Sequence, residues 1–231
     1  MFSLKRFSAV ILLGAIILTS AAAQAGNSMT VEQSYIMEYM EVMIIKETAR
    51  LNSRDSKLRA LDIIGEAINR GNTNDEIRET LTYLSSEGTR NVARENNRVV
   101  NNFPDVRRQA ARYLGLVGTE EARQSLIDVL KYENEPLVIQ EAIKSLGNIG
   151  TNNNNDTINA IVWVMNRFNN LNPDDLMALA AIDAFEKIAQ HNGGVVSQEV
   201  IECLNNILLG HYITPVRELA LQLLVTLRNH R

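Results

Sequence analysis

The residues with the clearest capacity for chemistry are arginines gathered in the middle of the chain. Six of the 23 residues from 90 to 112 are arginine, and Arg90, Arg94 and Arg98 recur at every fourth position. A spacing of four aligns side chains along one side of a helix, and the planar guanidinium group pairs with carboxylate or phosphate groups. If the segment is helical, the spacing predicts an anion-binding ridge. A loop tied by arginine to acidic side chains or carbonyl groups is the simpler interpretation.

Residues that could perform catalysis or bind a metal are scattered. His191, His211 and His230 fall beside predicted loops or at the end of the chain, and no HExxH, G-x-S-x-G or glycine-rich phosphate motif is present. The adjacent Asp174 and Asp175 precede a predicted helix, where capping explains them better than metal binding. We therefore expect a protein that is not an enzyme and has no cofactor or metal.

Helices must position these residues, because one pattern recurs along the chain. Residues 104–118, PDVRRQAARYLGLVG, return at 136–150 as PLVIQEAIKSLGNIG, and more faintly twice more. Each copy has apolar or small residues at a first position and at four, eight and eleven beyond it. These sets are Val106, Ala110, Leu114 and Val117; Val138, Ala142, Leu146 and Ile149; Met177, Ala181, Phe185 and Ile188; and Val216, Ala220, Leu224 and Leu227. At about 100° per residue each set forms one stripe on a helix, which must be buried against a neighbour.

Stacked helix pairs satisfy that requirement, so the sequence predicts an all-α solenoid of about five pairs. Residues 104–231 hold the clear repeats. Residues 26–103 hold degenerate ones, interrupted at 87–103 by an irregular insertion. A capping-box pattern at Thr30 and Gln33 opens a helix to about residue 50 that is rich in methionine, either as a packed terminal helix or as a partner-binding surface.

The form V-R-x-x-A-A-x-x-L-G in residues 104–118, partly kept in 136–150 and 214–220, resembles the HEAT repeat, and in particular the short HEAT-like repeats of bilin lyases. The resemblance implies a right-handed α-α superhelix of the HEAT or armadillo kind. It also implies a scaffold whose V-R-x-x-A helices line a concave face, and therefore an interaction surface rather than a reaction.

If those helices line a concave face, residues about 180° to 240° from each first stripe position point into it. They are Arg108, Arg112, Gln140, Lys144, Asp183, Glu186, Glu218 and Gln222. The row changes from basic to acidic, which predicts a graded surface for one protein or peptide partner, although a solvated polar face is the simpler interpretation.

Two single residues have both a functional and a structural interpretation. Trp163 lies away from the apolar stripe of its predicted helix, either as a partner-contact anchor or packed under a neighbouring repeat. Cys203 is the only cysteine, and its apolar neighbours favour a buried small hydrophobe over a reactive or bilin-attachment thiol.

The first 25 residues predict export. Lys5 and Arg6 precede an apolar run, and Ala23-Gln24-Ala25 is a small-x-small cleavage site, so we expect a periplasmic or extracellular protein without a transmembrane anchor after cleavage. Residues 26–231 carry 21 basic and 27 acidic side chains. The acidic balance argues against nucleic acid as the partner.

Two alternatives to a protein-binding scaffold stay open. One is a polyanion or cell-envelope polymer binder that uses the region from Arg90 to Arg112. The other is a bilin-lyase-like or other ligand-handling protein. The partner's identity and the oligomeric state do not follow from the sequence.

Overall fold

The structure is a computed structural model that describes residues 30–171, 173–194 and 197–229. The predicted signal peptide lies outside the described residues. Ten α-helices account for most of the described chain. They are α2 (Val31–Arg50), α3 (Arg54–Asn69), α4 (Asp75–Ser85), α5 (Pro104–Val117), α6 (Glu120–Tyr132), α7 (Pro136–Ile149), α8 (Asp156–Leu171), α9 (Asp175–His191), α10 (Gln198–Leu209) and α11 (Thr214–Asn229).

The chain divides into a first unit, residues 1–41, and a second unit, residues 42–231. The described part of the first unit opens with the predicted capping box: the Thr30 amide donates to Gln33 Oε1 at 3.0 Å, and the Gln33 amide donates to Thr30 Oγ1 at 3.3 Å. In the second unit the end of α2 packs through Val42, Ile45 and Ala49. The methionine-rich side predicted for this helix is not the side that packs there.

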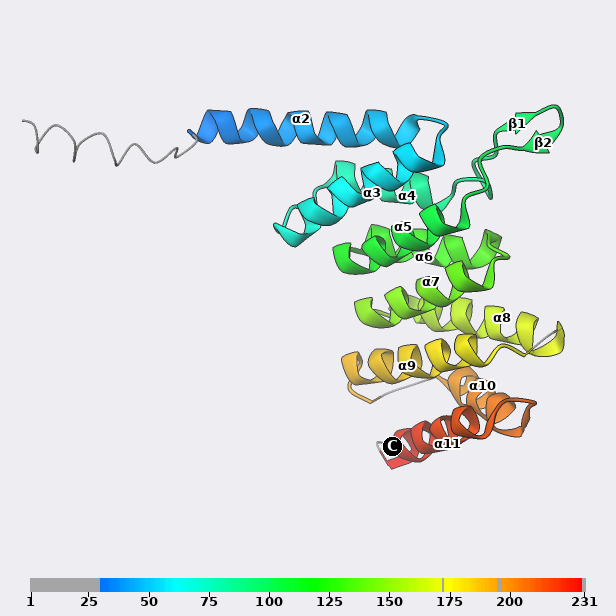
Figure 1. Ribbon diagram of the computed structural model, residues 1–231. Coiled ribbons are helices and arrows are strands. Elements are labelled where there is room, and N and C mark those ends of the chain that lie inside the picture. Colours follow the sequence, from blue (N-terminus) through cyan, green and yellow to red (C-terminus); the bar gives the residue numbers. More distant parts are fainter. Residues whose placement is uncertain (1–29, 172, 195–196, 230–231) are drawn as a thin grey trace, which may run out of the picture. The chain divides into compact units, whose positions relative to one another are not determined.

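From α3 onward the second unit is a solenoid of two layers (Figure 1). Helices α3, α5, α7, α9 and α11 follow one another in one layer, which we call the odd layer. Helices α4, α6, α8 and α10 form the even layer. Each even helix is followed in the chain by its odd partner, so the predicted all-α solenoid of helix pairs is confirmed.

The stripes predicted from the repeats form the core between the layers. In α5, α7 and α9 the first three stripe positions are fully buried, and in α11 the first two are. Val117, Ile149 and Leu224 are partly buried against the same core. In α11 Leu223 is buried more deeply than the predicted stripe residue Leu224.

Two glycines bring odd-layer helices unusually close together. A Cβ atom added at Gly115 would lie 2.6 Å from Ser145 Cβ, and one added at Gly147 would lie 2.6 Å from Ala184 Cα. On the even side, a groove of about 400 Å³ opens between α6 and α8. A stack with one layer spaced more closely than the other bends toward the closer layer. Tighter packing of the odd layer from α5 to α9 is the arrangement expected if that layer is the concave one, which stays a prediction.

Short polar side chains and glycines delimit these helices. Ser53 and Thr119 cap α3 and α6, each accepting a hydrogen bond from an amide three residues on. Gly118 ends α5 with φ 69°, a left-handed conformation that favours glycine. Thr73 and Glu76 have the spacing of a capping box. Asn74 caps α4 instead, because its Oδ1 accepts from the Ile77 amide at 3.0 Å.

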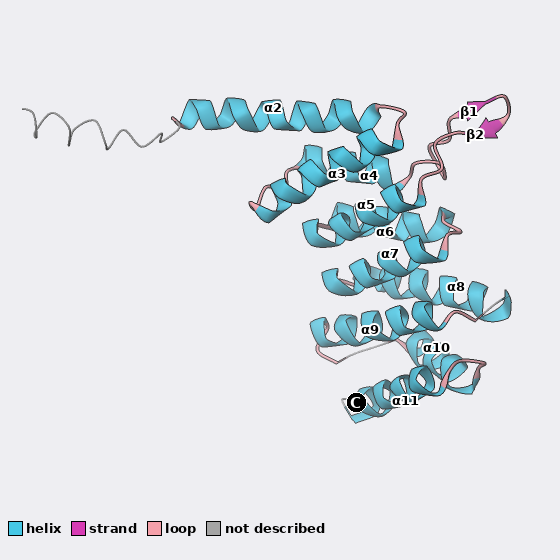
Figure 2. Cartoon of the chain, in the orientation of Figure 1, coloured by secondary structure: helices cyan, strands magenta, loops and turns pink. Residues whose placement is uncertain are grey.

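The segment predicted to be an irregular insertion contains a small antiparallel hairpin, with β1 (Arg94–Glu95) paired to β2 (Arg98–Val99). Asn96 and Asn97 form its turn with φ values of 48° and 64°. Asparagine tolerates such values, which two-residue hairpin turns require at both central positions. Figure 2 shows the hairpin extending away from the helices.

Candidate protein-interaction surface

At the positions predicted for the interaction row, the exposed charged side chains of the odd layer are basic on α5 and α7 and acidic on α9 and α11. Arg108 and Arg112 on α5 and Lys144 on α7 are exposed, and Glu186 on α9 and Glu218 on α11 are exposed further along the stack. Asp183 is half-exposed and Gln222 is exposed. We call these seven residues the odd-layer row. It runs from basic to acidic in the order that the sequence predicts.

Gln140 differs from the other residues predicted for this row. Its side chain is 6% exposed, and its Nε2 donates to both carboxylate oxygens of Asp174 at 3.4 Å. Asp174 in turn caps α9, with its Oδ1 accepting from the Met177 amide at 2.9 Å. Gln140 therefore holds α7 against the start of α9.

Polar contacts between successive odd helices engage part of the row. Arg108 Nε lies 3.9 Å from Glu141 Oε2, a long ion pair between α5 and α7. Lys187 Nζ bridges α7 and α9, donating to Asn148 Oδ1 at 2.9 Å and to Asp183 Oδ2 at 2.7 Å.

Among the described residues, Arg112 and Lys144 make no ion pair or hydrogen bond through their side chains. The same helices also expose leucines: Leu116 lies four residues after Arg112 on α5, and Leu137 lies seven residues before Lys144 on α7. Cationic groups without internal partners beside exposed apolar side chains form a surface that can bind an acidic, partly apolar partner.

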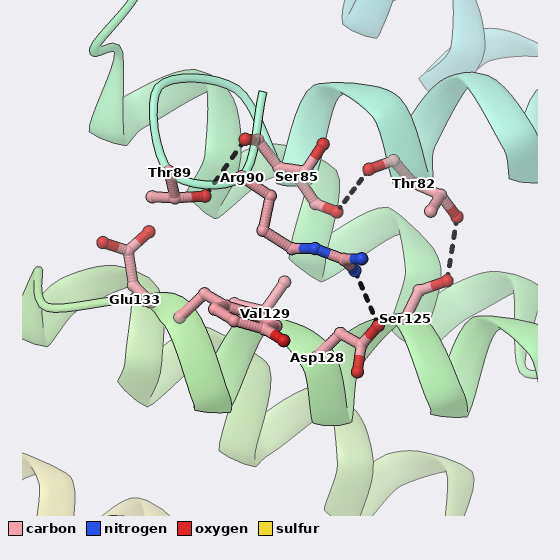
Figure 3. Close-up of a pocket in the computed structure, with 10 residues that line it drawn as sticks. Thr82, Ser85, Thr89, Arg90, Ser125, Asp128, Val129 and Glu133 are labelled. Carbon is pink, nitrogen blue, oxygen red and sulfur yellow. Dashed lines mark hydrogen bonds and ion pairs between the residues drawn. The ribbon is translucent and has the colours of Figure 1, made fainter. Parts of the chain in front are cut away.

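The three arginines predicted as an anion-binding ridge do not form one, because the segment is not helical. Arg90 lies in the turn before the hairpin, and Arg94 and Arg98 lie in β1 and β2. Arg90 is already paired, because its Nη1 lies 2.7 Å from Asp128 Oδ2 (Figure 3). Its guanidinium also lies 5.0 Å from the Tyr132 ring centroid. Arg90, Asp128 and Tyr132 line a pocket with a volume of about 30 Å³. This pocket is too small to hold more than a water molecule.

Trp163 lies on the even side of the solenoid and lines the groove between α6 and α8. Its side chain is 49% exposed, and the Arg167 guanidinium stacks 5.0 Å from its ring centroid. The tryptophan is therefore not packed under a neighbouring repeat, and it is on a different surface from the odd-layer row.

Part of this solenoid is similar to a known repeat. Residues 98–166 match the family model of HEAT repeats. The match runs from β2 through α5, α6 and α7 into α8, and it supports a HEAT-repeat protein. A comparison with curated proteins finds no match.

Sequence reasoning missed a buried polar cluster that joins the HEAT helices to the hairpin. Its members are Lys57, Glu87, Asn101, Arg107 and Glu133, all 5% exposed or less, and we call them the polar junction. Lys57 Nζ donates to Glu87 Oε2 at 2.9 Å, and Asn101 Nδ2 donates to Glu87 Oε1 at 2.7 Å.

Arg107 connects the two halves of the polar junction. It binds the Glu133 carboxylate through Nε and Nη2, and its Nη1 donates to the Glu87 carbonyl at 3.0 Å. Alignment of the repeats indicates that position 107 is buried. Arg107 corresponds to Ile139 and Ala178 in the next two copies, and both of those are fully buried.

Within the described residues, no three His, Cys, Asp or Glu side chains gather in a way that could hold a metal ion. Cys203 is buried, and burial raises the pKa of its thiol to about 12. The nucleophilic thiolate is therefore scarce at neutral pH. No helix of the described residues has the length and apolar character that a membrane crossing needs.

Proposed function

We propose that this protein is an exported, non-catalytic HEAT-repeat scaffold that binds a protein or peptide partner through the odd-layer row. HEAT repeats commonly bind proteins, and all-α folds of this kind are typically non-catalytic. The observation that supports this surface most directly is the exposed, unpaired state of Arg112 and Lys144, on helices that also expose Leu116 and Leu137.

The mechanism is preorganisation. The packed stripes and the polar junction fix the helices before a partner arrives, so binding immobilises few side chains beyond those of the row itself. Charge at the two ends of the row favours a partner that is acidic near α5 and α7 and basic near α9 and α11.

Crosslinking tests the surface. A photoreactive residue placed at Lys144 in the full chain should capture a defined partner in the cell envelope. The double variant Arg112→Glu and Lys144→Glu, with the photoreactive residue moved to Leu116, should lose that partner. The matched control is Arg94→Glu with Arg98→Glu, which reverses two exposed arginines of the hairpin. If the row variant keeps its partner and the hairpin variant loses it, the proposed surface is wrong.

Export is tested separately from the surface. Cleavage after Ala25 gives a mature chain that begins at Gly26, which mass spectrometry of the amino terminus detects in the purified protein. Ala25→Asp replaces a small residue at the cleavage site and should leave the leader attached. A native chain that retains residues 1–25 and fractionates with the cytosol would contradict export.

A further inference from the structure

The groove between α6 and α8 combines an aromatic wall with free amide groups. Ile127 and Leu130 on α6 are buried and form an apolar floor. Trp163 stands at one side, and exposed Gln124 and Asn159 stand at the rim. We propose that this groove is a binding site for a neutral oligosaccharide, with the indole of Trp163 as the platform for a sugar ring. The site is independent of the odd-layer row.

The tryptophan is held in place before any ligand binds. Arg167 stacks on the indole, and its Nη2 donates to the Glu133 carbonyl at 2.9 Å, so the cation is anchored at both ends. A fixed indole presents a flat apolar surface with little conformational entropy left to lose. The C–H face of a pyranose ring is the complementary surface, since its hydroxyl groups project around the ring edge.

The polar groups at the rim suit hydroxyl partners. The side chains of Gln124 and Asn159 make no hydrogen bonds with other described residues, and each amide offers both donors and an acceptor. A sugar hydroxyl likewise both donates and accepts. Because the walls are helices, the groove offers no strand edge to the backbone of an extended peptide.

The charge of the groove favours an uncharged ligand. One cation, Lys131, and one anion, Asp156, line it. Lys131 Nζ already lies 3.3 Å from Asp128 Oδ1 outside the groove. The volume of about 400 Å³ falls within the range of about 300–1,000 Å³ that is usual for small-ligand sites. A short oligosaccharide segment is therefore the class of ligand that size, charge and free hydrogen-bonding groups favour together.

The chain has a single tryptophan, so its fluorescence reports on this site directly. We would titrate the full mature chain with three neutral hexasaccharides: β-1,4-linked glucose, β-1,4-linked N-acetylglucosamine and α-1,4-linked glucose. At least one should produce a saturable change in intensity or emission wavelength. Calorimetry should then show affinity reduced tenfold or more in Trp163→Ala and in Gln124→Ala with Asn159→Ala, and reduced less in Trp163→Phe.

Tyr132→Ala is the matched control, because Tyr132 is a half-exposed aromatic residue of α6 outside the groove. The affinity of this variant for the hexasaccharide should equal that of the parent protein. Circular dichroism verifies that each variant is folded. The proposal is overturned if no hexasaccharide changes the fluorescence at concentrations up to about 10 mM. It is also overturned if Trp163→Ala leaves the calorimetric affinity unchanged, or if that variant instead loses the crosslinked protein partner. Failure of the Arg112 and Lys144 experiment would leave this result untouched.

Discussion

Arg107 and Glu133 form a two-pronged ion pair inside the solenoid, with Nε 2.6 Å from Oε2 and Nη2 3.2 Å from Oε1. Both side chains are 3% exposed. Glu133 Oε1 also accepts from the amides of Asn134 and Glu135. The pair therefore joins α5 to the turn between α6 and α7, and through the Glu87 carbonyl it joins both to the base of the hairpin.

Breaking this pair from one side should cost more than removing both charges. Arg107→Met leaves the Glu133 carboxylate buried without its cation, so we expect the free energy of unfolding to fall by about 3–5 kcal/mol. Arg107→Met combined with Glu133→Gln should lose clearly less than the sum of the two single changes. Urea denaturation followed by circular dichroism measures all three. The control Arg108→Met, at an exposed neighbour, should stay within about 0.5 kcal/mol. Strict additivity of the two single changes would contradict the coupling.

The close approach of α7 and α9 requires a glycine. In Gly147→Ala the new Cβ would meet the Cα atom of Ala184 at 2.6 Å, and a backbone atom can yield only if a helix shifts. We expect a loss of about 1–3 kcal/mol from overpacking, offset in part by up to about 1 kcal/mol of helix propensity. Thermal unfolding compares this variant with Lys144→Ala, an exposed change in the same helix. Equal or higher stability of Gly147→Ala would show that the helices can move apart freely.

Substitutions in the hairpin tip and at its base should have different effects on the free energy of unfolding. Residues 91–100 are all exposed, so replacing the hairpin tip from Arg94 to Val99 by a two-residue Asn-Gly turn should alter stability by less than about 1 kcal/mol. Asn101→Ala should cost about 1–3 kcal/mol, because it removes hydrogen bonds to Glu87 Oε1 and to the Asn91 carbonyl, each 2.7 Å long, and leaves the buried Glu87 Oε1 without that donor. Chemical denaturation tests both variants. A large loss from the tip replacement would mean that the hairpin contributes to the core.

Cys203 should make the protein less stable in alkali. Burial raises the pKa of its thiol to about 12 from an ordinary value of 9.0, so the unfolded chain releases this proton first. The stabilisation is complete below pH 9 and is lost as the pH rises toward 12. Between pH 9 and pH 10, the advantage of the parent over Cys203→Ala should shrink by about 1 kcal/mol. Urea titrations of both proteins at pH 8, 9 and 10 measure this difference. A constant difference would show that the thiol is not shielded.

The all-α solenoid was predictable because its evidence is local. A stripe at positions one, five, nine and twelve identifies the buried face of a helix whatever lies opposite, so Val106, Ala110 and Leu114 could be assigned to the core from periodicity alone. Capping is equally local, and Thr119 needs only the amide of Ala122 three residues on. The hairpin within residues 87–103 was not predicted, although asparagine at 96 and 97 tolerates the positive φ values that its turn adopts.

The environment of each polar side chain, in contrast, was decided by residues far away in the sequence. Arg107 and Arg108 are adjacent and chemically identical, yet one is buried against Glu133, 26 positions later, and the other is exposed. Gln140 was predicted for the exposed row, but Asp174, 34 positions later, holds it in the interior. Helical periodicity fixes the direction in which a side chain leaves its own helix. Whether an opposite charge meets it there depends on how neighbouring helices pack, and only the tertiary structure determines that.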